Sequence, residues 1–315
     1  MKKVIAIDRA FPSYAPLEEQ LKTLDAELVF AEDKSEEALS ALCKDADAVM
    51  TTYTKVPAAV IQAMDHCAMI IRTGIGVDNI DVDAAKAKGI QVSFVPDYCR
   101  EEVADQTVAL ALCAARKITL CAKYTKEDWD MKKRMGYVPR LSQCTAGILS
   151  FGAIGKMIAE RLKAFGMQVW AYDPYLKEEA FTALGVKCCK TQEEIFREAD
   201  FIILTGPLTP ERFHIINADT IAMMKKTAFV VNTARGPLVD EAALAEALRS
   251  GRLAGAGLDV FEHEPITDAS LYDLDNLVIT PHVAFYSVAA FPDLEGKVFD
   301  EVIRAVKGEP LRTHI

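Results

Sequence analysis

The chain has 315 residues, of which 51% are hydrophobic and 26% charged, as expected of a globular protein with two domains of ordinary size. Its net charge of −10 argues against binding to nucleic acid or to an anionic membrane surface. No stretch is apolar for long enough to span a membrane, and the eight cysteines form no C-x-x-C pair, so we expect a cytoplasmic protein without a metal site.

Short apolar segments alternate with helical patterns at the start of the chain. The expected strands are Val4–Ile7, Glu27–Ala31, Ala48–Thr52, Met69–Arg72 and Gln91–Phe94. The expected helices between them are Leu17–Leu24, Ser35–Cys43, Pro57–Met64 and Val82–Lys88. This alternation predicts a parallel sheet with helices on both faces. A long helix, Tyr98–Lys117, would then carry the chain into a second sheet.

A nucleotide-binding turn is predicted in the middle of the chain. The segment AGILSFGAIG, residues 146–155, is typical of a buried strand, a tight turn and the start of a helix; the next strand, Met167–Tyr172, ends at Asp173. In a Rossmann unit the second glycine, here Gly152, lets the backbone approach a pyrophosphate, and the third, Gly155, allows close helix packing. Asp173 lies 18 residues after Gly155, where an acidic residue binds the ribose hydroxyls. Its carboxylate would repel a 2′-phosphate, which favours NAD over NADP.

Ser150 replaces the first glycine of the G-x-G-x-x-G pattern. A serine costs free energy if this position requires a positive φ, although its side chain is small enough to allow a close approach. Glycine-rich turns also occur for backbone reasons alone. The prediction of a dinucleotide site therefore rests on the strand, turn, helix, second strand and terminal acid occurring in this order.

The rest of the chain completes a second sheet and then returns to the first. Its later strands are expected at Phe201–Leu204, Thr227–Val231, Gly255–Leu258 and Leu277–Ile279, and the last helix at Glu295–Lys307. We therefore expect an α/β protein of two doubly wound parallel-sheet domains with a hinge cleft. The first is a flavodoxin-like substrate-binding domain of residues 1–98 and 290–315, and the second is an inserted Rossmann NAD-binding domain of residues 99–289.

Arg235, Glu264 and His282 each follow one of the late strands. Because ligands of open α/β sheets bind at the carboxyl ends of the strands, we expect the three side chains to converge near the nicotinamide. Reduction of a 2-keto acid places negative charge on the ketone oxygen, and a histidine can donate the proton near neutral pH. A neighbouring carboxylate favours the imidazolium, and an arginine can hold the substrate carboxylate and polarise the keto group.

Four segments, residues 72–81, 232–241, 257–265 and 280–284, resemble the signature segments of the D-isomer-specific 2-hydroxyacid dehydrogenases. The similarity runs from about residue 48 to residue 308. It implies that Arg235 binds and orients the substrate, that His282 is the acid/base, and that Glu264 tunes the histidine. It also implies that a loop, Gly74–Gly76, binds the substrate carboxylate through backbone N–H groups.

The turn and the resemblance together predict two sets of binding residues. The cofactor set is Ser150, Phe151, Gly152, Ala153, Ile154, Asp173, Thr205, Gly206, Pro207, Asn232, Thr233, Ala234, Arg235, Asp259, His282 and Phe285. The substrate set is Tyr53, Gly74, Ile75, Gly76, Arg235 and His282. Tyr53 and Phe285 could equally be core aromatics, and Phe285 stands where some members of the family carry tryptophan.

Several residues have competing interpretations. Glu262 rivals Glu264, but the spacing to Pro265 favours Glu264 and leaves Glu262 solvated. His263 would face away from its neighbour Glu264, because adjacent side chains of an extended segment point in opposite directions. The other histidines, His66, His214 and His314, are interpreted as incidental. The segment around Trp129 could form a homodimer contact, as such a segment does in this family, or could be a lid or plain surface.

The leading hypothesis is an NAD-dependent oxidoreductase acting on a small D-2-hydroxy acid or its 2-keto acid, working as a homodimer. Residues 98–105 are similar to the branch that contains the C-terminal-binding protein corepressors, so the alternative is an NAD-binding interaction protein that retains the site. Oxidation of another anion, such as formate or phosphite, remains a further possibility.

Overall fold

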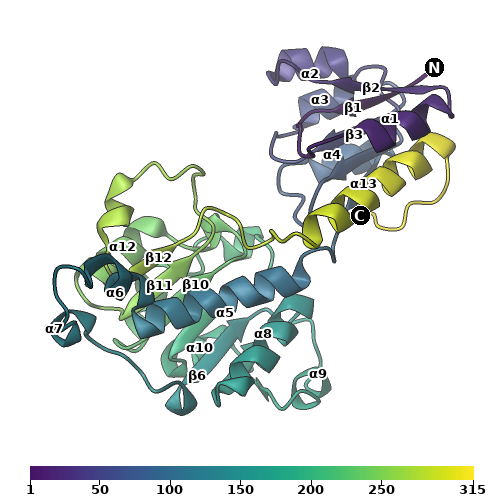
Figure 1. The fold of residues 1–315 in the computed structure, drawn as a ribbon. Helices are drawn as coiled ribbons and strands as arrows, with labels where there is room; N and C mark the ends of the chain where they lie inside the picture. The colour runs from purple at the N-terminus through teal and green to yellow at the C-terminus, as the bar shows by residue number, and fades with distance from the viewer. The chain divides into compact units, whose positions relative to one another are not determined.

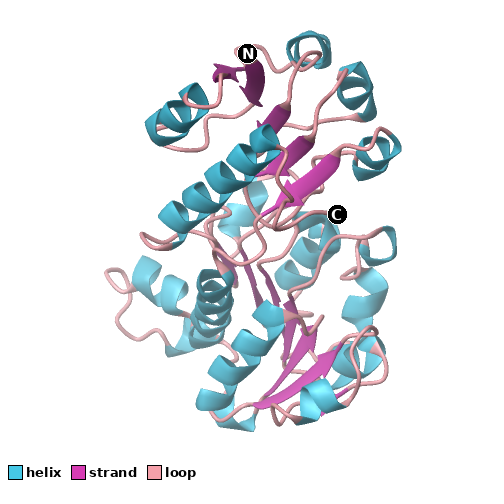
Figure 2. Ribbon diagram, turned by 90° about the vertical axis from the view of Figure 1, so that its right-hand side faces the viewer, coloured by secondary structure: helices cyan, strands magenta, loops and turns pink.

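The computed structural model describes residues 1–315, which form two compact units. Unit 1 consists of Met1–Tyr98 and Ser287–Ile315, and unit 2 consists of Cys99–Tyr286. Each unit contains a parallel sheet with helices on both of its faces (Figure 2), which confirms the predicted fold class. The chain returns to unit 1 at Ser287 rather than at residue 290. None of the helices is long and apolar enough to cross a membrane.

The sheet of unit 1 has the strand order β2-β1-β3-β4-β5, which is the flavodoxin order. Its strands are β1 (Lys2–Ala6), β2 (Ala26–Phe30), β3 (Ala48–Thr51), β4 (Met69–Arg72) and β5 (Gln91–Phe94). Its helices are α1 (Ala15–Lys22), α2 (Glu36–Leu42), α3 (Ala58–Ala63), α4 (Val82–Ala87) and α13 (Ala290–Lys307). Figure 1 shows α13, in yellow, beside the purple α1, so the two ends of the chain complete one unit.

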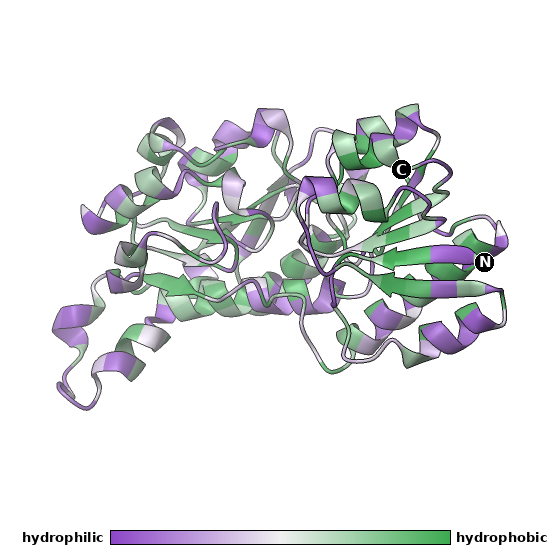
Figure 3. Cartoon of the chain, turned by 90° about the horizontal axis from the view of Figure 1, so that it is seen from above, coloured by the Kyte–Doolittle hydropathy of each residue, from purple (hydrophilic) through white to green (hydrophobic).

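Local sequence signals explain where these helices begin. The side chains of Ser35 and Asp81 accept hydrogen bonds from the N–H groups of Ala38 and Ala84, which caps α2 and α4. Helix α13 begins at Ala290, before the expected Glu295, because the hydroxyl of Ser287 accepts hydrogen bonds from the N–H groups of Ala289 and Ala290. The strands between the helices are apolar and buried, as Figure 3 shows in green.

The sheet of unit 2 has the strand order β12-β11-β10-β9-β6-β7-β8, with all pairs parallel. The strands are β6 (Thr145–Leu149), β7 (Gln168–Tyr172), β8 (Lys187–Cys188), β9 (Phe201–Leu204), β10 (Phe229–Asn232), β11 (Gly255–Leu258) and β12 (Leu277–Ile279). This is the Rossmann order with one added strand, and its switch point lies between β6 and β9.

The helices of unit 2 are α5 (Arg100–Arg116), α6 (Ile118–Tyr124), α7 (Lys132–Met135), α8 (Ala153–Ala164), α9 (Glu179–Thr182), α10 (Gln192–Glu198), α11 (Ala218–Met223) and α12 (Glu241–Arg249). The long α5 packs on β10, β11 and α8. A Cβ on Gly257 of β11 would lie 2.9 Å from the Cβ of Leu110, so this glycine permits the close approach of α5 to the sheet. With all strands parallel, the residues that follow β6, β7, β9, β10, β11 and β12 gather at one edge of the sheet.

Candidate active site

The turn after β6 has the geometry that a dinucleotide requires. Ser150 adopts a φ of +83°, so the first position of the turn does require a left-handed backbone conformation. This conformation costs free energy in serine, because serine has a Cβ and glycine does not. A Cβ on Gly155 would lie 2.7 Å from the carbonyl oxygen of Ser150, so the third glycine is needed for α8 to reach the strand. At Gly152 a Cβ would meet no atom within 4 Å, which leaves the N-terminus of α8 open to a ligand.

Hydrogen bonds join this turn to the loops that follow β7 and β9. Asp173 accepts from the N–H of Phe151 at 2.9 Å through one carboxylate oxygen, and from the N–H of Tyr175 at 3.0 Å through the other. The hydroxyl of Thr205 donates to the carbonyl oxygen of Ser150 at 2.7 Å. Ala153 and Ile154 begin α8, where free N–H groups and the helix dipole favour phosphate. These residues fit a dinucleotide at the switch point of the sheet.

The three expected catalytic residues meet at the same edge of unit 2. The Nδ1 atom of His282 lies 2.6 Å from Oε2 of Glu264, and both side chains are about one third exposed, at 34% and 37%. Arg235 follows β10 and donates to the carbonyl oxygen of Ala234 at 2.7 Å. Its positive charge also acts on Glu264. The site therefore combines a cation, a carboxylate and an imidazole.

The environment of Glu264 favours its charged form. Burial alone would raise its pKa, but hydrogen bonds from His282 and from the N–H of Phe261, which donates at 3.0 Å, outweigh burial. The charges of His282 and Arg235 act in the same direction, so the pKa of Glu264 is lowered. The ionised carboxylate is a suitable hydrogen-bond partner for Nδ1 of the imidazole.

Asp259 holds the loop that carries His282. It is fully buried, and its carboxylate accepts from the hydroxyl of Thr280 at 2.5 Å and from the N–H groups of Val283 at 3.0 Å and Ala284 at 2.9 Å. Its backbone carbonyl accepts from the N–H of His282 at 2.7 Å. These bonds fix His282 at a φ of +52°, a conformation that costs free energy in a residue other than glycine. Asp259, expected among the cofactor residues, thus has a positioning role in this structure.

Two further members of the expected cofactor set make hydrogen bonds within the protein. Asn232 is fully buried, donates to the carbonyl oxygen of Arg235 at 2.8 Å and accepts from the N–H of Ala234 at 3.0 Å. The hydroxyl of Thr233 shares a hydrogen bond of 2.6 Å with that of Thr107 on α5. The sequence indicated the polar residue types but gave no sign of these partners. Phe285 lies at the site, with its ring centroid 6.3 Å from that of His282 in an edge-on orientation.

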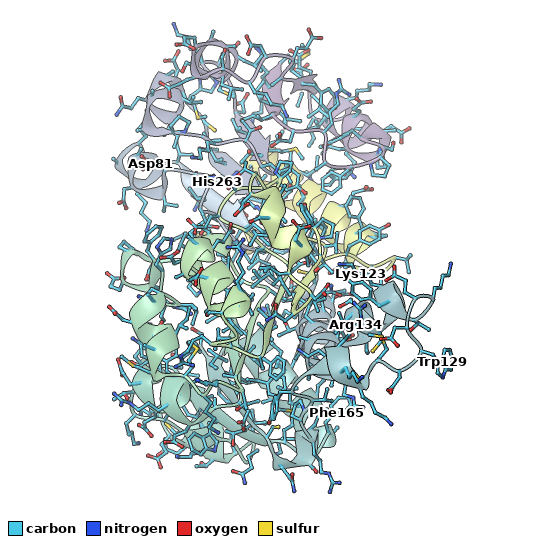
Figure 4. The ribbon with its side chains drawn as sticks, turned by 90° about the vertical axis from the view of Figure 1, so that its left-hand side faces the viewer. Asp81, Lys123, Trp129, Arg134, Phe165 and His263 are labelled. Atoms are coloured by element: carbon cyan, nitrogen blue, oxygen red, sulfur yellow. The ribbon has the colours of Figure 1, made fainter.

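The interpretation of Glu262 as a solvated residue is wrong. Its side chain accepts from the N–H of Glu241 at 3.0 Å and lies 3.2 Å from Nε2 of His214, so it anchors the start of α12. His214 thus lies beside this carboxylate, although its Nε2 atom makes no hydrogen bond. The neighbouring His263, labelled in Figure 4, is exposed and belongs to neither pair.

The expected substrate residues of unit 1 lie at one edge of its sheet. Tyr53 follows β3, and the loop Gly74–Gly76 follows the neighbouring β4. The N–H of Gly74 donates to the carbonyl oxygen of Arg72 at 2.8 Å, whereas the N–H groups of Ile75 and Gly76 remain available to a ligand. Gly74 has a φ of +150°, which L side chains rarely adopt, so this position favours glycine; a Cβ would also displace the guanidinium of Arg72.

Asp8, which the sequence did not single out, orders the loop that carries Tyr53. It is buried after β1 and accepts hydrogen bonds from the N–H groups of Thr52 at 2.8 Å, Tyr53 at 3.0 Å and Thr54 at 3.1 Å. The ammonium of Lys34 lies 2.7 Å from its other oxygen. Only its place after the first strand of a parallel sheet could have suggested this role.

Comparison with known proteins identifies close relatives of this arrangement. The family model described as D-isomer specific 2-hydroxyacid dehydrogenase, NAD binding domain, matches residues 108–284. The chain is 41% identical to a D-3-phosphoglycerate dehydrogenase of Methanocaldococcus jannaschii, over 93% of the chain and 56% of that relative. It therefore spans little more than half the length of that enzyme. It is 36% identical to a glyoxylate reductase of Pyrococcus furiosus, over 98% of the chain and 94% of that protein.

A solved structure shows the same fold. A D-lactate dehydrogenase of Aquifex aeolicus, complexed with NAD and lactic acid, superimposes with a TM-score of 0.85 at 30% identity. The match covers 98% of this chain and 96% of that one. Two parallel α/β domains and an NAD-binding sheet are therefore features shared with known dehydrogenases.

Proposed function

The chain belongs to the D-isomer-specific 2-hydroxyacid dehydrogenase family, and on that premise we propose that it interconverts a small D-2-hydroxy acid and its 2-keto acid with NAD. The observation that carries the proposal is the distance of 2.6 Å between Glu264 and His282, with the charge of Arg235 acting on the same carboxylate. Bound NAD would supply the hydride acceptor, held by the turn after β6 and by Asp173.

The side chains of unit 2 would handle the proton and the charge. Glu264 holds Nδ1 of His282, which leaves Nε2 of the imidazole to exchange a proton with the substrate oxygen. The guanidinium of Arg235 would bind the substrate carboxylate and stabilise negative charge on the keto oxygen. The edge-on ring of Phe285 would limit access of water to the imidazole.

We further propose that unit 1 contributes the N–H groups of Ile75 and Gly76 as donors to the substrate carboxylate. They follow β4 and make no hydrogen bond within the protein, while Gly74 supplies the backbone conformation, at a φ of +150°. Tyr53, exposed in the loop that Asp8 orders, is the side chain proposed to select substrate size.

A 2-keto acid screen tests the proposed activity. The purified chain is mixed with NADH and glyoxylate, pyruvate or 3-phosphohydroxypyruvate, and the loss of NADH absorbance is followed. The names of the relatives justify this panel. We expect oxidation of NADH with at least one acid and none with His282→Ala. If NADH binds but no acid is reduced, the interaction-protein alternative replaces the proposal.

We also propose that the segment around Trp129 mediates a homodimer. Trp129 is 88% exposed and lies at the outer end of the segment after α6 (Figure 4), while Ile118 and Tyr137 are also exposed apolar residues of the same region. Large exposed apolar side chains that gather in one region mark interaction surfaces. Sedimentation analysis of the chain and of Trp129→Ser tests this, with a dimer expected only for the unchanged chain.

A further inference from the structure

A guanidinium lies at the switch point of the unit 2 sheet, where the sequence predicted none. Arg212 ends a short 3-10 helix, Pro210–Arg212, in the loop after β9. Its side chain reaches back toward the start of the loop, where Nη1 donates to the carbonyl oxygen of Pro207 at 3.0 Å. Strand β9 is hydrogen-bonded to β6, so this loop borders the turn that carries Ser150.

Gly206 provides the space that this side chain occupies. A Cβ built on Gly206 would lie 1.8 Å from Nη1 of Arg212 and 2.1 Å from Oγ of Ser150. The guanidinium and the serine hydroxyl therefore flank one point beside the turn. Both are hydrogen-bond donors, and neither could adopt this position against a larger residue at 206.

The guanidinium is incompletely satisfied by the protein. Its Nη2 atom is buried without a hydrogen-bond partner in the protein. An unpaired buried donor costs free energy, and an arginine retains its charge under all ordinary conditions. Within unit 2 its charge interacts with Asp173 and Tyr175, the residues at the ribose end of the predicted dinucleotide site. A rotation of the side chain that exposes this donor would let it reach an anionic oxygen of a ligand.

We propose that Arg212 binds the 2′-phosphate of NADP(H), so that the chain accepts NADP(H) as well as NAD(H). The inference rests on the proposed dinucleotide-binding function and adds a specificity-determining residue to it. The serine hydroxyl of Ser150 is a second donor on the same side of the turn.

The charges around Asp173 make this dual use physically reasonable. A carboxylate at the end of β7 would by itself repel a 2′-phosphate. Here both oxygens of Asp173 accept hydrogen bonds from backbone N–H groups, and the positive charge of Arg212 acts on the same group. A planar guanidinium can donate two parallel hydrogen bonds to a phosphate. The electrostatic potential around Asp173 is thus less negative than its carboxylate alone would make it.

Calorimetric titration with NAD⁺ and with NADP⁺ tests the proposal without any turnover. The chains are the unchanged protein, Arg212→Gln and the control Arg197→Gln. Arg197 is an exposed cation in the last turn of α10, which precedes β9 and so lies at the opposite edge of the sheet. The thermal midpoint of each variant shows whether it is folded, and Arg212→Lys replaces Arg212→Gln if the glutamine variant is not.

We expect the unchanged chain to bind both dinucleotides. Loss of a charge-assisted phosphate contact should weaken NADP⁺ in Arg212→Gln by about tenfold or more, with NAD⁺ changed by less than about threefold. The NADP⁺ affinity of Arg212→Lys should lie between those of the unchanged chain and Arg212→Gln, because lysine keeps the charge and loses the planar guanidinium. Arg197→Gln should leave both affinities unchanged.

Three results would overturn the inference. They are NAD⁺ binding without measurable NADP⁺ binding, equal weakening of both dinucleotides in Arg212→Gln, and no change of either. Equal weakening would place Arg212 at a phosphate that both cofactors share. Failure of both dinucleotides to bind the unchanged chain would refute the proposed function itself, so the two failures are distinguishable.

Discussion

Oε2 of Glu264 lies 2.6 Å from Nδ1 of His282, although 18 residues separate them in the chain. The bond fixes the orientation of the imidazole beside a carboxylate whose pKa is lowered. Both residues follow parallel strands of one sheet, so the pair depends on the register of β11 and β12.

The pair predicts a pH effect. In Glu264→Gln a neutral amide replaces the carboxylate that holds Nδ1 of His282, so kcat/KM for keto acid reduction should fall by about tenfold or more and lose the part of its acid-side pH dependence that comes from titration of Glu264. In the unchanged chain the carboxylate stays ionised as pH falls through its ordinary pKa of 4.5, because its pKa is lowered. The matched control is Glu262→Gln, whose carboxylate serves α12, and it should keep the original profile. Identical profiles for the two variants would contradict the pairing.

Arg235 should be required for its geometry as well as its charge. Arg235→Lys keeps a cation but loses the planar fork that matches a carboxylate, so we expect kcat/KM to fall by about 10² or more, with NAD affinity changed little. Steady-state kinetics and calorimetry with NAD⁺ check the two quantities separately. A lysine variant with unchanged kcat/KM would remove Arg235 from its proposed role.

Asp259 should act through the position of His282. Asp259→Asn replaces an acceptor oxygen with an amide NH₂ that faces backbone donors, so it should destabilise the protein by about 1–3 kcal/mol. It should also lower kcat more than it raises KM, because the imidazole loses its fixed place. Urea unfolding and steady-state kinetics measure the two effects. A loss of stability with full kcat would show that the loop holds His282 without this carboxylate.

Asp8 should make unit 1 sensitive to acid. Burial would raise its pKa, but hydrogen bonds from Lys34, Thr52 and Thr54 outweigh burial and lower the pKa below its ordinary value of 3.8. A lowered pKa contributes stability that is present above pH 3.8 and is lost as pH falls through the folded-state pKa. The free energy of unfolding of Asp8→Asn should therefore lie about 1–3 kcal/mol below that of the unchanged chain at neutral pH.

The difference between the two chains should shrink as the solution is acidified below pH 3.8. Urea unfolding at several pH values measures it. A difference that stays constant down to pH 2 would mean that the loss of an acceptor oxygen, rather than the loss of the negative charge, accounts for the effect.

The sequence was sufficient for the architecture and for the common sheet edge of three polar side chains, because both follow from local patterns. Apolar strands with helical spacers specify a parallel sheet, and residues after its strands share an edge, so Arg235, Glu264 and His282 could be placed together in advance. Helix boundaries were displaced where a side chain decides them, as Ser287 does for α13.

The supporting contacts could not be predicted in the same way. Asn232, Asp259 and Asp8 are buried polar residues whose partners depend on the folded backbone, and no spacing rule identifies them. Arg212 lies in a loop, and its reach toward Ser150 depends on the missing side chain of Gly206. Long-range side-chain geometry of this kind is set by tertiary packing rather than by local sequence.

The close approach of the Ser150 side chain to Gly206 limits which substitutions position 206 can accept. A methyl group at position 206 collides with the serine hydroxyl, which lies 2.1 Å from where that methyl group would stand, and with the guanidinium of Arg212. Restoring the common glycine at position 150 alone leaves a hollow beside position 206. Position 206 can therefore accept a side chain only if Ser150 and Arg212 both change place, whereas glycine at position 150 needs no second replacement.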